Sequence, residues 1–432
     1  MTGKARLTLC DAKSGRVISR TEECNMVTNA INRLFAPPRQ GMFGQWDMAA
    51  MLGGYLPMYK NLLGGIMLLG SAVKEDADDF MLPAAVNPVG FAGDAYSGSN
   101  VMRGSLNLNE SYETENGYHF TWDFATDKAN GTIRCIALTN RLFGNVGFNE
   151  TETADGAMLF DPLTPASAAS SPRVFLGGGQ LGYVVGCFSS NTFTFAMFSA
   201  NKLTLRTFTH PLPQGLKIND SAVSFPYADA VAELPFNIDG NGWFFVNPAD
   251  ERIYCFACES AGSESTTLRY CAPKVTDPQD MIQGSVTLPY LGYTTVNAAV
   301  YNGQVYVMTN SGTRVFTMDG ALLRSYDAAI QGHSRFFEHN GAIMSWICKN
   351  GGNYCQNFSC EGEVITYGLP MKLCYAPAIK PPYAIAQYTD RMSRSYAALM
   401  CCTNYMATIN NLSQPLTKTA SQTLKIEYDI MN

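Results

Sequence analysis

The second part of the chain, from about Pro172, repeats one pattern: apolar strands alternate with turns rich in Asn, Gly and Asp. Each repeat predicts a three- or four-stranded antiparallel meander, of the kind that is stacked radially in a β-propeller. We therefore expect a mainly β fold with a propeller-like array of about five blades; a series of β-sandwiches is the alternative. The repeats are LGYVVGCFSSNTFTFAMFSANKLTLRTF, GNGWFFVNPADERIYCFACESAGSESTTLRYC, NAAVYNGQVYVMTNSGTRVFTMDGALLRSY, RFFEHNGAIMSWICKNGGNYCQNFSCEGEVITY and YAIAQYTDRMSRSYAALMCCTNYMATIN.

The two ends of the chain predict β structure outside these repeats. ARLTLCD, the turn KSG and RVISRTEE together predict a hairpin near the N-terminus. A short helix should follow in NMVTNAINRLFA, with Asn25 as its N-cap and Pro37 as its stop. At the other end, TASQTLKIEYDI alternates apolar and polar residues and predicts a half-buried strand.

The stretch Thr121–Asn140, TWDFATDKANGTIRCIALTN, predicts two strands and the turn between them. Trp122 and Phe124 alternate on the first strand. Asn130 and Gly131 form a turn dipeptide, because both residues tolerate positive φ. Upstream, the irregular apolar segment Met42–Gly70 needs a cover, and we expect it to pack against neighbouring subunits, anchored by Trp122 and Phe124.

Composition limits the class of protein. A chain of 432 residues with 46% hydrophobic residues suits two or three domains, and its 15% charged residues are few for a soluble protein. A net charge of −6 without a basic cluster argues against nucleic-acid binding. The 13 cysteines follow no disulfide framework, so we expect free thiols in a reducing cytoplasm. The start lacks the apolar core of a signal peptide, and Leu62–Gly70 is too short to insert into a membrane.

Several phrases together resemble tail-associated structural proteins from phages and prophages of gut Firmicutes. They are GKARLTLCDAKSGRVISRTEECNMVTNA, KNLLGGIMLLGSAVKED, RGSLNLNES, WDFATDKANGTI and TASQTLKIEYDI, in that order, covering roughly residues 1–150 and 416–432. The resemblance implies a virion component of the tail-fibre, baseplate or receptor-binding kind, commonly a homo-oligomer and often a trimer. It implies no catalytic residues.

The motifs that could bind a cofactor or metal have structural explanations. Gly177, Gly179 and Gly182 satisfy G-x-G-x-x-G, but a strand follows where a dinucleotide site needs a helix. Cys255 and Cys258 form a CxxC without a second pair. A zinc set of His333, His339, Cys355 and Cys360, and a calcium set in Glu75–Asp79, also lack the required spacing. We expect no cofactor and no metal, with His339 a solvated turn residue.

A glycan-binding site in the repeats is the functional expectation, and glycan hydrolysis is its rival. Sugars stack on aromatic rings beside polar turns, and the candidate contacts are Trp243, Tyr270, Tyr301, Trp346 and Tyr354. A hydrolase needs two carboxylates a few ångströms apart. The turns offer Asp239, Asp250, Glu251, Asp319 and Glu338, which nothing in the sequence pairs. We therefore predict that the protein is not an enzyme.

The sequence thus predicts three regions: an attachment and oligomerisation module over 1–160, a propeller-like β domain over 161–415, and a strand over 416–432 that returns to the module. We expect a virion protein of the tail fibre or baseplate, assembled in the host cytoplasm. Its partners would be sister copies, most simply as a homotrimer, other phage tail or capsid proteins, and a host-surface carbohydrate. A tail glycan depolymerase and a decoration or fibre protein without receptor contact are the alternatives.

Overall fold

The structure is a computed structural model. It describes residues 2–35, 58–83, 87–143, 160–162, 174–175, 183–189, 192–209, 227–238, 244–261, 265–289, 295–309, 311–327, 335–349, 352–358, 365–369, 378–380, 383–389 and 395–431. Within these ranges the fold is mainly β, and no helix has the length and apolar character needed to span a bilayer.

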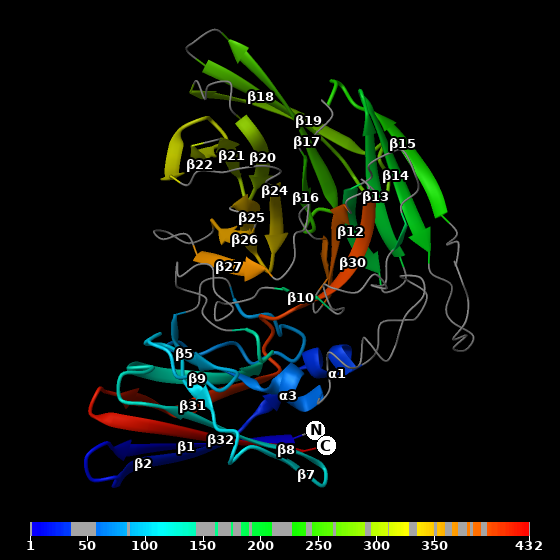
Figure 1. Cartoon of the computed structure of the whole chain (residues 1–432). Coiled ribbons are helices and arrows are strands. Elements are labelled where there is room, and N and C mark those ends of the chain that lie inside the picture. Colours follow the sequence, from blue (N-terminus) through cyan, green and yellow to red (C-terminus); the bar gives the residue numbers. More distant parts are fainter. Residues whose placement is uncertain are drawn as a thin grey trace.

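The chain forms two lobes, which Figure 1 shows one above the other. The base lobe comprises the described residues within 2–143 and 403–431, so both chain ends contribute to it. The propeller lobe comprises the described residues between 160 and 402. The predicted return of the chain at 416 is corrected to an earlier point, because the strand β31 (Thr408–Lys418) already pairs inside the base lobe.

One sheet of the base lobe interleaves the two ends of the chain. It runs β2-β1-β32-β8-β6, with β7 also paired to β8. The predicted terminal hairpin and C-terminal strand are confirmed, and β32 lies between β1 and β8. The register sets Ile426 opposite Leu7 on one side and opposite Trp122 on the other. The strands are β1 (Thr2–Asp11), β2 (Val17–Cys24), β6 (Ser105–Leu106), β7 (Tyr112–Thr114), β8 (Gly117–Phe124) and β32 (Gln422–Met431).

The second sheet packs against the first and carries the two helices. Its order is β3-β31-β9-β4-β5. Its strands other than β31 are β3 (Met26–Val27), β9 (Gly131–Thr139), β4 (Gly65–Leu69) and β5 (Pro88–Ala92), and the helices are α1 (Asn29–Phe35) and α3 (Met58–Leu63). The period-2 alternation of β1, β8 and β32 turns one face of the first sheet towards the second, where both contribute to one apolar core.

The N-terminal helix is confirmed, but its predicted cap is wrong. The helix α1 begins at Asn29, and the backbone N–H of Ala30 donates to Oγ1 of Thr28 at 3.3 Å, so Thr28 occupies the capping position. Asn25 precedes the short strand β3, and its side-chain amide donates to the hydroxyl of Tyr428 on β32. A long-range contact therefore takes the residue that local spacing assigned to the helix.

The described part of the segment Met42–Gly70 is covered by its own chain. All five residues of β4 are buried, and β4 is hydrogen-bonded to β5 on one side and to β9 on the other. The helix α3 contributes Leu62 and Leu63 to the same core. The expectation that neighbouring subunits cover this stretch is thus wrong for residues 58–70, and residues 42–57 lie outside the described ranges.

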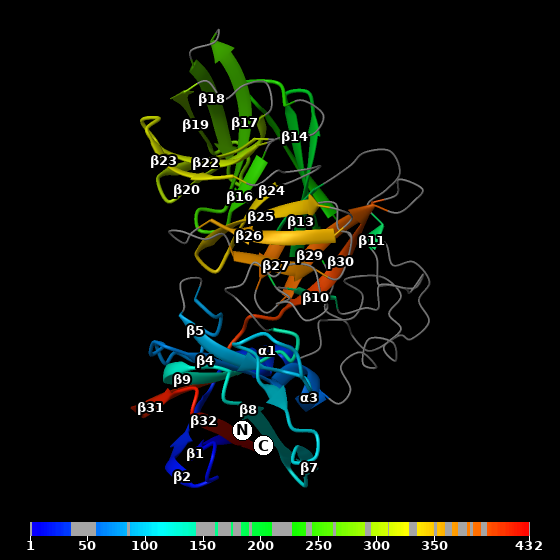
Figure 2. The same ribbon diagram turned by 60° about the vertical axis from the view of Figure 1, so that its left-hand side comes forward.

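The propeller lobe is a ring of five antiparallel sheets, which confirms the predicted propeller-like array over the β-sandwich alternative. Figure 2 shows the ring from the side, above the base lobe. Blade 1 is β12 (Tyr183–Ser189), β13 (Thr192–Ser199), β14 (Lys202–Thr209) and β15 (Tyr227–Glu233); blade 2 is β16 (Phe244–Asn247), β17 (Arg252–Ala261), β18 (Ser265–Pro273) and β19 (Met281–Pro289); blade 3 is β20 (Thr295–Tyr301), β21 (Gln304–Thr309), β22 (Gly312–Thr317) and β23 (Leu322–Tyr326); blade 4 is β24 (Arg335–His339), β25 (Ala342–Lys349), β26 (Gly352–Asn357) and β27 (Ile365–Leu369); blade 5 is β28 (Ala378–Lys380), β29 (Tyr383–Thr389) and β30 (Ser395–Cys402), completed by β10 (Phe160–Pro162) and β11 (Val174–Phe175).

Burial gives the direction of the blades. The first strand is mostly buried in blades 3 and 4 and half buried in blade 2, whereas the fourth strand of blades 1, 2 and 3 is mostly exposed. The chain thus starts each blade near the ring axis and ends it at the rim. Blade 5 closes the ring: β10 and β11, from the beginning of the lobe, both pair with β30, from its end. This closure joins the two ends of the lobe by hydrogen bonds.

Blade 4 fixes the ring to the base lobe. The Asn340 amide donates to the carbonyl of Leu82 at 3.0 Å, from the tight turn between β24 and β25. Asn340 and Gly341 both have positive φ, 50° and 77°, which is the geometry of a type I′ hairpin turn. The apolar core of the base lobe continues into this blade through Phe337, Met344 and other residues. The two lobes therefore share one apolar cluster.

Candidate functional site

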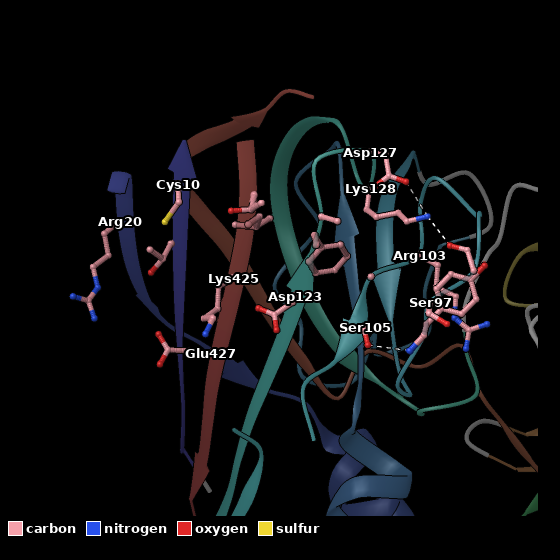
Figure 3. Close-up of a pocket in the computed structure, with 18 residues that line it drawn as sticks. Cys10, Arg20, Ser97, Arg103, Ser105, Asp123, Asp127, Lys128, Lys425 and Glu427 are labelled. Atoms are coloured by element: carbon pink, nitrogen blue, oxygen red, sulfur yellow. Dashed lines mark hydrogen bonds and ion pairs between the residues drawn. The ribbon is translucent and has the colours of Figure 1, made fainter. Parts of the chain in front are cut away.

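A polar groove of about 910 Å³ lies on the outer face of the six-stranded sheet of the base lobe. Figure 3 shows its two sides: Cys10, Arg20, Lys425 and Glu427 project from the strands, and Arg103 projects from a loop opposite them. Figures 1 and 2 place this sheet on the side of the base lobe that is turned away from the propeller. Sequence reasoning placed ligand contacts in the repeats and missed this groove.

The alternation of the strands makes this face polar. On β32, Leu424, Ile426, Tyr428 and Ile430 are buried, so the residues between them point outward. The outward residues meet charged partners: Lys425 approaches Glu110, in the turn before β7, at 2.7 Å, and Glu427 lies 3.7 Å from Arg6 on β1. Arg6 in turn approaches Glu22 on β2 at 2.8 Å. The alternating TLKIEYDI pattern was a signal for this charged face.

Glu22 shows how strongly the face organises its charges. The carboxylate accepts a salt bridge from Lys4 at 2.7 Å and another from Arg6 at 2.8 Å. The hydrogen bonds from Lys4 and then Arg6 lower the pKa of Glu22 to about 2. The carboxylate stays ionised at any physiological pH, although each exposed pair contributes little to stability. Glu22 is therefore a permanently charged part of this face.

The opposite wall of the groove carries a ring and two cations. The Arg103 guanidinium lies 4.3 Å from the ring centre of Tyr96, and the Lys128 ammonium lies 5.8 Å from it. Lys128 also donates to the carbonyls of Gly98 at 2.8 Å and Asn100 at 2.9 Å, which holds the wall in shape. This arrangement suits an extended polar ligand that carries both signs of charge.

The three carboxylates of the groove all have partners, and Glu427 lies 3.7 Å from the guanidinium of Arg6. Asp123 accepts a hydrogen bond from the Asn107 amide at 2.8 Å. Asp127 pairs with Lys128 at 3.2 Å, and the hydrogen bond from Lys128 lowers the pKa of that carboxyl. A glycosidase acid needs a raised pKa, so Asp127 has the wrong shift for that role.

Two of the five candidate glycan contacts are buried inside the propeller. Trp346 is 0% exposed and Tyr301 is 7% exposed, so both are core residues and the prediction that they face a ligand is corrected. Tyr270 is half-buried beside Tyr254, with 6.0 Å between ring centres. Tyr354 lies on β26 opposite Ile347, and Trp243 lies outside the described residues. Successive residues of a strand point to opposite faces of the sheet, and the sequence alone does not say which face is buried.

The residues of the Thr121–Asn140 stretch hold the base lobe together. The Trp122 indole N–H donates to the carbonyl of Gly64 at 3.1 Å, so Trp122 does anchor the apolar segment, within its own chain. Phe124 is 1% exposed in the same core. In the turn, the positive φ values fall on Ala129 (49°) and Gly131 (152°), and not on Asn130. The assignment of positive φ to Asn130 is thus wrong.

Asn130 has a different task in that turn. Its amide donates to the carbonyl of Thr126 at 3.0 Å, and its Oδ1 accepts from the ammonium of Lys418 at 2.9 Å. Lys418 also donates to the carbonyl of Ala125 at 2.8 Å and is 1% exposed. A buried ammonium that is surrounded by acceptors ties β31 to the turn. The role of Asn130 depends on a residue almost 300 positions away, so no local signal predicted it.

The described candidate carboxylates of the propeller lie on three different blades. Asp250 accepts from the Tyr254 hydroxyl at 2.8 Å in blade 2, beside Glu251, and Asp319 accepts from Thr317 in blade 3. Glu338 is half-buried in blade 4, where burial raises the pKa of its carboxyl and the N–H of Gly341 donates to it at 2.6 Å. Asp239 lies outside the described residues.

The possible metal ligands are also separated. Cys255 and Cys258 are three residues apart on one strand, so their side chains point to opposite faces. His339 is 3% exposed, which corrects the expectation of a solvated histidine, and it lies on β24, whereas Cys355 lies on β26. The described ranges contain no group of three or more His, Cys, Asp or Glu residues that could hold an ion. The other proposed ligands, His333 and Cys360, and the glycines Gly177, Gly179 and Gly182 lie outside them.

No family model and no curated protein matches this chain. Solved structures resemble it in fold only. A GH43 glycoside hydrolase, engineered for endo-xylanase and exo-arabinofuranosidase activity, has 8% identity and a TM-score of 0.31 over 50% of this chain, and the match spans about half of its own length, 48%. TolB from Acinetobacter baumannii has 10% identity and a TM-score of 0.29, over 71% of this chain and 81% of its own.

A catalytically inactive virginiamycin B lyase from Staphylococcus aureus, solved with quinupristin, has 9% identity and a TM-score of 0.26, over 59% of this chain and 97% of its own. At these values no residue of the three proteins can be placed on this chain. What this chain shares with them is a mainly β fold with several four-stranded antiparallel sheets.

Proposed function

We propose that the protein is a phage virion component of the tail-fibre or baseplate type, in which the base lobe attaches to the particle and the propeller presents a binding surface to the host. The observation that carries the proposal is the arrangement of the lobes. The propeller is inserted between β9 and β31 of the base lobe, while the charged groove lies on the face turned away from it. One molecule can therefore contact two bodies at once.

The base lobe has the construction that an attachment platform needs. Its terminal strands lie next to each other in one sheet, so tension on either end is shared across β1, β32 and β8. The docked turn of blade 4 keeps the ring at one orientation to this platform. The resemblance to tail-associated proteins lies mostly in the base lobe, which agrees with a shared attachment part and a variable host-binding part.

The groove offers the chemistry for a protein partner on the particle. Lys425, Arg20 and Arg103 alternate with Asp123 and Glu427 around it. Such a surface recognises a segment of complementary charge, and it sets the orientation more than the affinity. For the propeller we propose a carbohydrate of the host surface, since the ring of Tyr270 on β18 remains partly accessible.

The test uses the full-length protein and two charge reversals. Lys425→Glu alters the groove, and Lys202→Glu makes the same change on an exposed residue of blade 1. Particles assembled with the Lys425→Glu protein should contain less of it than wild-type particles, as measured by mass spectrometry, whereas Lys202→Glu should be incorporated normally. Equal incorporation of both variants would contradict attachment through the groove.

Host binding is tested separately. Labelled full-length protein should bind some gut Firmicutes cells, and the binding should fall when surface glycans are removed. The Lys425→Glu variant should bind as well as the wild type. Sugar release from purified cell-wall glycan would instead establish a depolymerase, and particle incorporation without any cell binding would indicate a decoration or fibre role.

A further inference from the structure

Two buried thiols face each other across blade 2. Cys255 on β17 and Cys271 on β18 are direct cross-strand neighbours. Both are 0% exposed and both are free thiols. They pack between blades 1 and 2 in an apolar cluster with Leu203 and Val275. Neither cysteine belongs to the groove or to the interface between the lobes.

The backbone geometry of this pair meets the requirement for a disulfide. Residues directly opposite each other in antiparallel strands have Cα atoms about 4.5–5.5 Å apart. Disulfides need Cα separations of about 4.4–6.8 Å. Their side chains project from the same face of the sheet, because residues paired across antiparallel strands do so. Cys255 and Cys271 can therefore be joined without moving either strand.

The neighbouring cysteine is not a competitor. Cys258 stands three residues after Cys255 on β17, so its side chain is on the other face of the blade, opposite Leu268. The CxxC that is visible in the sequence therefore does not define a redox pair. The pair comes from the register of β17 and β18, which brings together residues from two different strands.

We propose that Cys255 and Cys271 are a latent disulfide, which closes by exchange with a small-molecule disulfide once the protein leaves a reducing compartment. The Cys255 thiolate attacks one sulfur of the reagent, forms a mixed disulfide and releases one thiolate. The Cys271 thiolate then attacks the Cys255 sulfur and releases the second. The protein loses two protons and two electrons, and the reagent is reduced to two thiols.

Burial controls the rate of this reaction. Desolvation raises the pKa of the Cys255 thiol, so the reactive thiolate is scarce in the closed blade. The exchange therefore proceeds through local opening of the hairpin between β17 and β18, and mild urea should accelerate it. The use of such a lock outside the cell depends on the proposed virion role, whereas the chemistry of the pair does not.

The closed bond should stabilise the propeller. It encloses the 15 residues from Phe256 to Tyr270, and restricting a loop of this length in the unfolded chain predicts a Tm increase of about 5–10 °C. The bond should also couple the opening of β17 to that of β18, because one strand can no longer leave without the other. Blade 2 would then resist unfolding outside the cell better than inside.

The experiment treats the full-length protein with oxidised glutathione in mild urea, followed by alkylation and peptide mapping. We expect the peptides that contain Cys255 and Cys271 to become joined, the intact mass to fall by two hydrogens, and the Tm to rise. Cys255→Ala and Cys271→Ala should each abolish the joined peptide and the Tm increase. Cys355→Ala removes a buried thiol whose cross-strand neighbours are Trp346 and Tyr367, so this control should keep both effects.

The map of the wild-type protein decides the question even if a variant fails to fold. The inference is overturned if Cys255 and Cys271 each carry glutathione or the alkylating tag after oxidation, or if either is joined to another cysteine. Absence of host-cell binding would count against the proposed function alone, because the exchange reaction needs no cell or particle.

Discussion

His339 on β24 and Asn404 in the connection back to the base lobe meet with 3.0 Å between Nε2 and Oδ1. The amide oxygen can only accept, so Nε2 of the neutral imidazole donates. Both residues are buried, at 3% and 7% exposure. This hydrogen bond lies in the interface between the lobes, next to the contact between Asn340 and Leu82. It links a blade of the ring to the chain that leaves the ring.

Removal of the acceptor should loosen the junction. In Asn404→Ala the imidazole of His339 loses its amide acceptor inside the buried interface. We therefore expect the free energy of unfolding to fall by about 1–3 kcal/mol. Urea denaturation followed by circular dichroism measures the change. Asn109→Ala, on an exposed loop of the base lobe, is the matched control and should change stability little. Equal stability of both variants would show that the contact contributes nothing.

The same histidine predicts a dependence of stability on pH. Burial lowers the pKa of His339 from 6.5 to about 4. Between these values the unfolded chain binds the proton and the folded chain does not, so folding weakens as pH falls from 6.5 towards 4. The contribution is roughly 3 kcal/mol across the window. It is complete above pH 6.5 and lost below about pH 4.

This dependence is measured as a difference from His339→Gln, whose amide still donates but does not titrate. Between pH 7 and pH 4.5, the free energy of unfolding should fall more for the wild type than for the variant. The comparison cancels the other titrating groups, which both proteins share. Parallel pH profiles would contradict a buried neutral imidazole.

Trp122 should contribute more than its apolar area. Trp122→Phe keeps a ring in the core but leaves the carbonyl of Gly64 without the indole N–H that donates to it at 3.1 Å. We expect a loss of about 1–3 kcal/mol in the stability of the base lobe. Tyr112→Phe, a change at a residue that is 56% exposed, is the control for denaturation by urea. Unchanged stability would mean that the hydrogen bond is unimportant.

Lys418 should be intolerant of an uncharged replacement. Lys418→Met keeps the length of the side chain but removes the ammonium that donates to the carbonyl of Ala125 and to Oδ1 of Asn130. We expect a loss of about 1–3 kcal/mol, since these acceptors lie in the interior. Lys425→Met, on the outer face, is a matched control and should cost less than 1 kcal/mol. Thermal unfolding of both variants distinguishes them.

Local patterns were sufficient for the strands themselves. The alternation of Leu424, Ile426, Tyr428 and Ile430 predicts a half-buried strand, and β32 is one. Asn302 and Gly303 also occupy a turn with both φ values positive, as Asn-Gly turns should. These features depend on neighbours within a few residues, so they can be read from the chain one stretch at a time.

The assignment of sites failed where a distant partner was decisive. Trp346 is an aromatic residue of the kind that sugars stack on, but it lies in the core. Asn25 has the position in the sequence that predicts a helix N-cap, but its side chain contacts Tyr428. The polar groove needs strands from both ends of the chain, and no single stretch of sequence contains more than part of it. A period-2 pattern indicates that one face of a strand is buried, but it does not identify the segment that covers this face.

The sequence by itself determined the strand content, the tight turns and the repeats that form the ring. It also indicated that the two chain ends belong to one module. Only the tertiary structure decided that β4 is covered by β5 and β9, that blade 4 docks on the base lobe, and that Cys255 meets Cys271 and not Cys258. The reason is physical: backbone geometry and alternation are local properties, whereas register and burial depend on contacts between residues far apart in the chain.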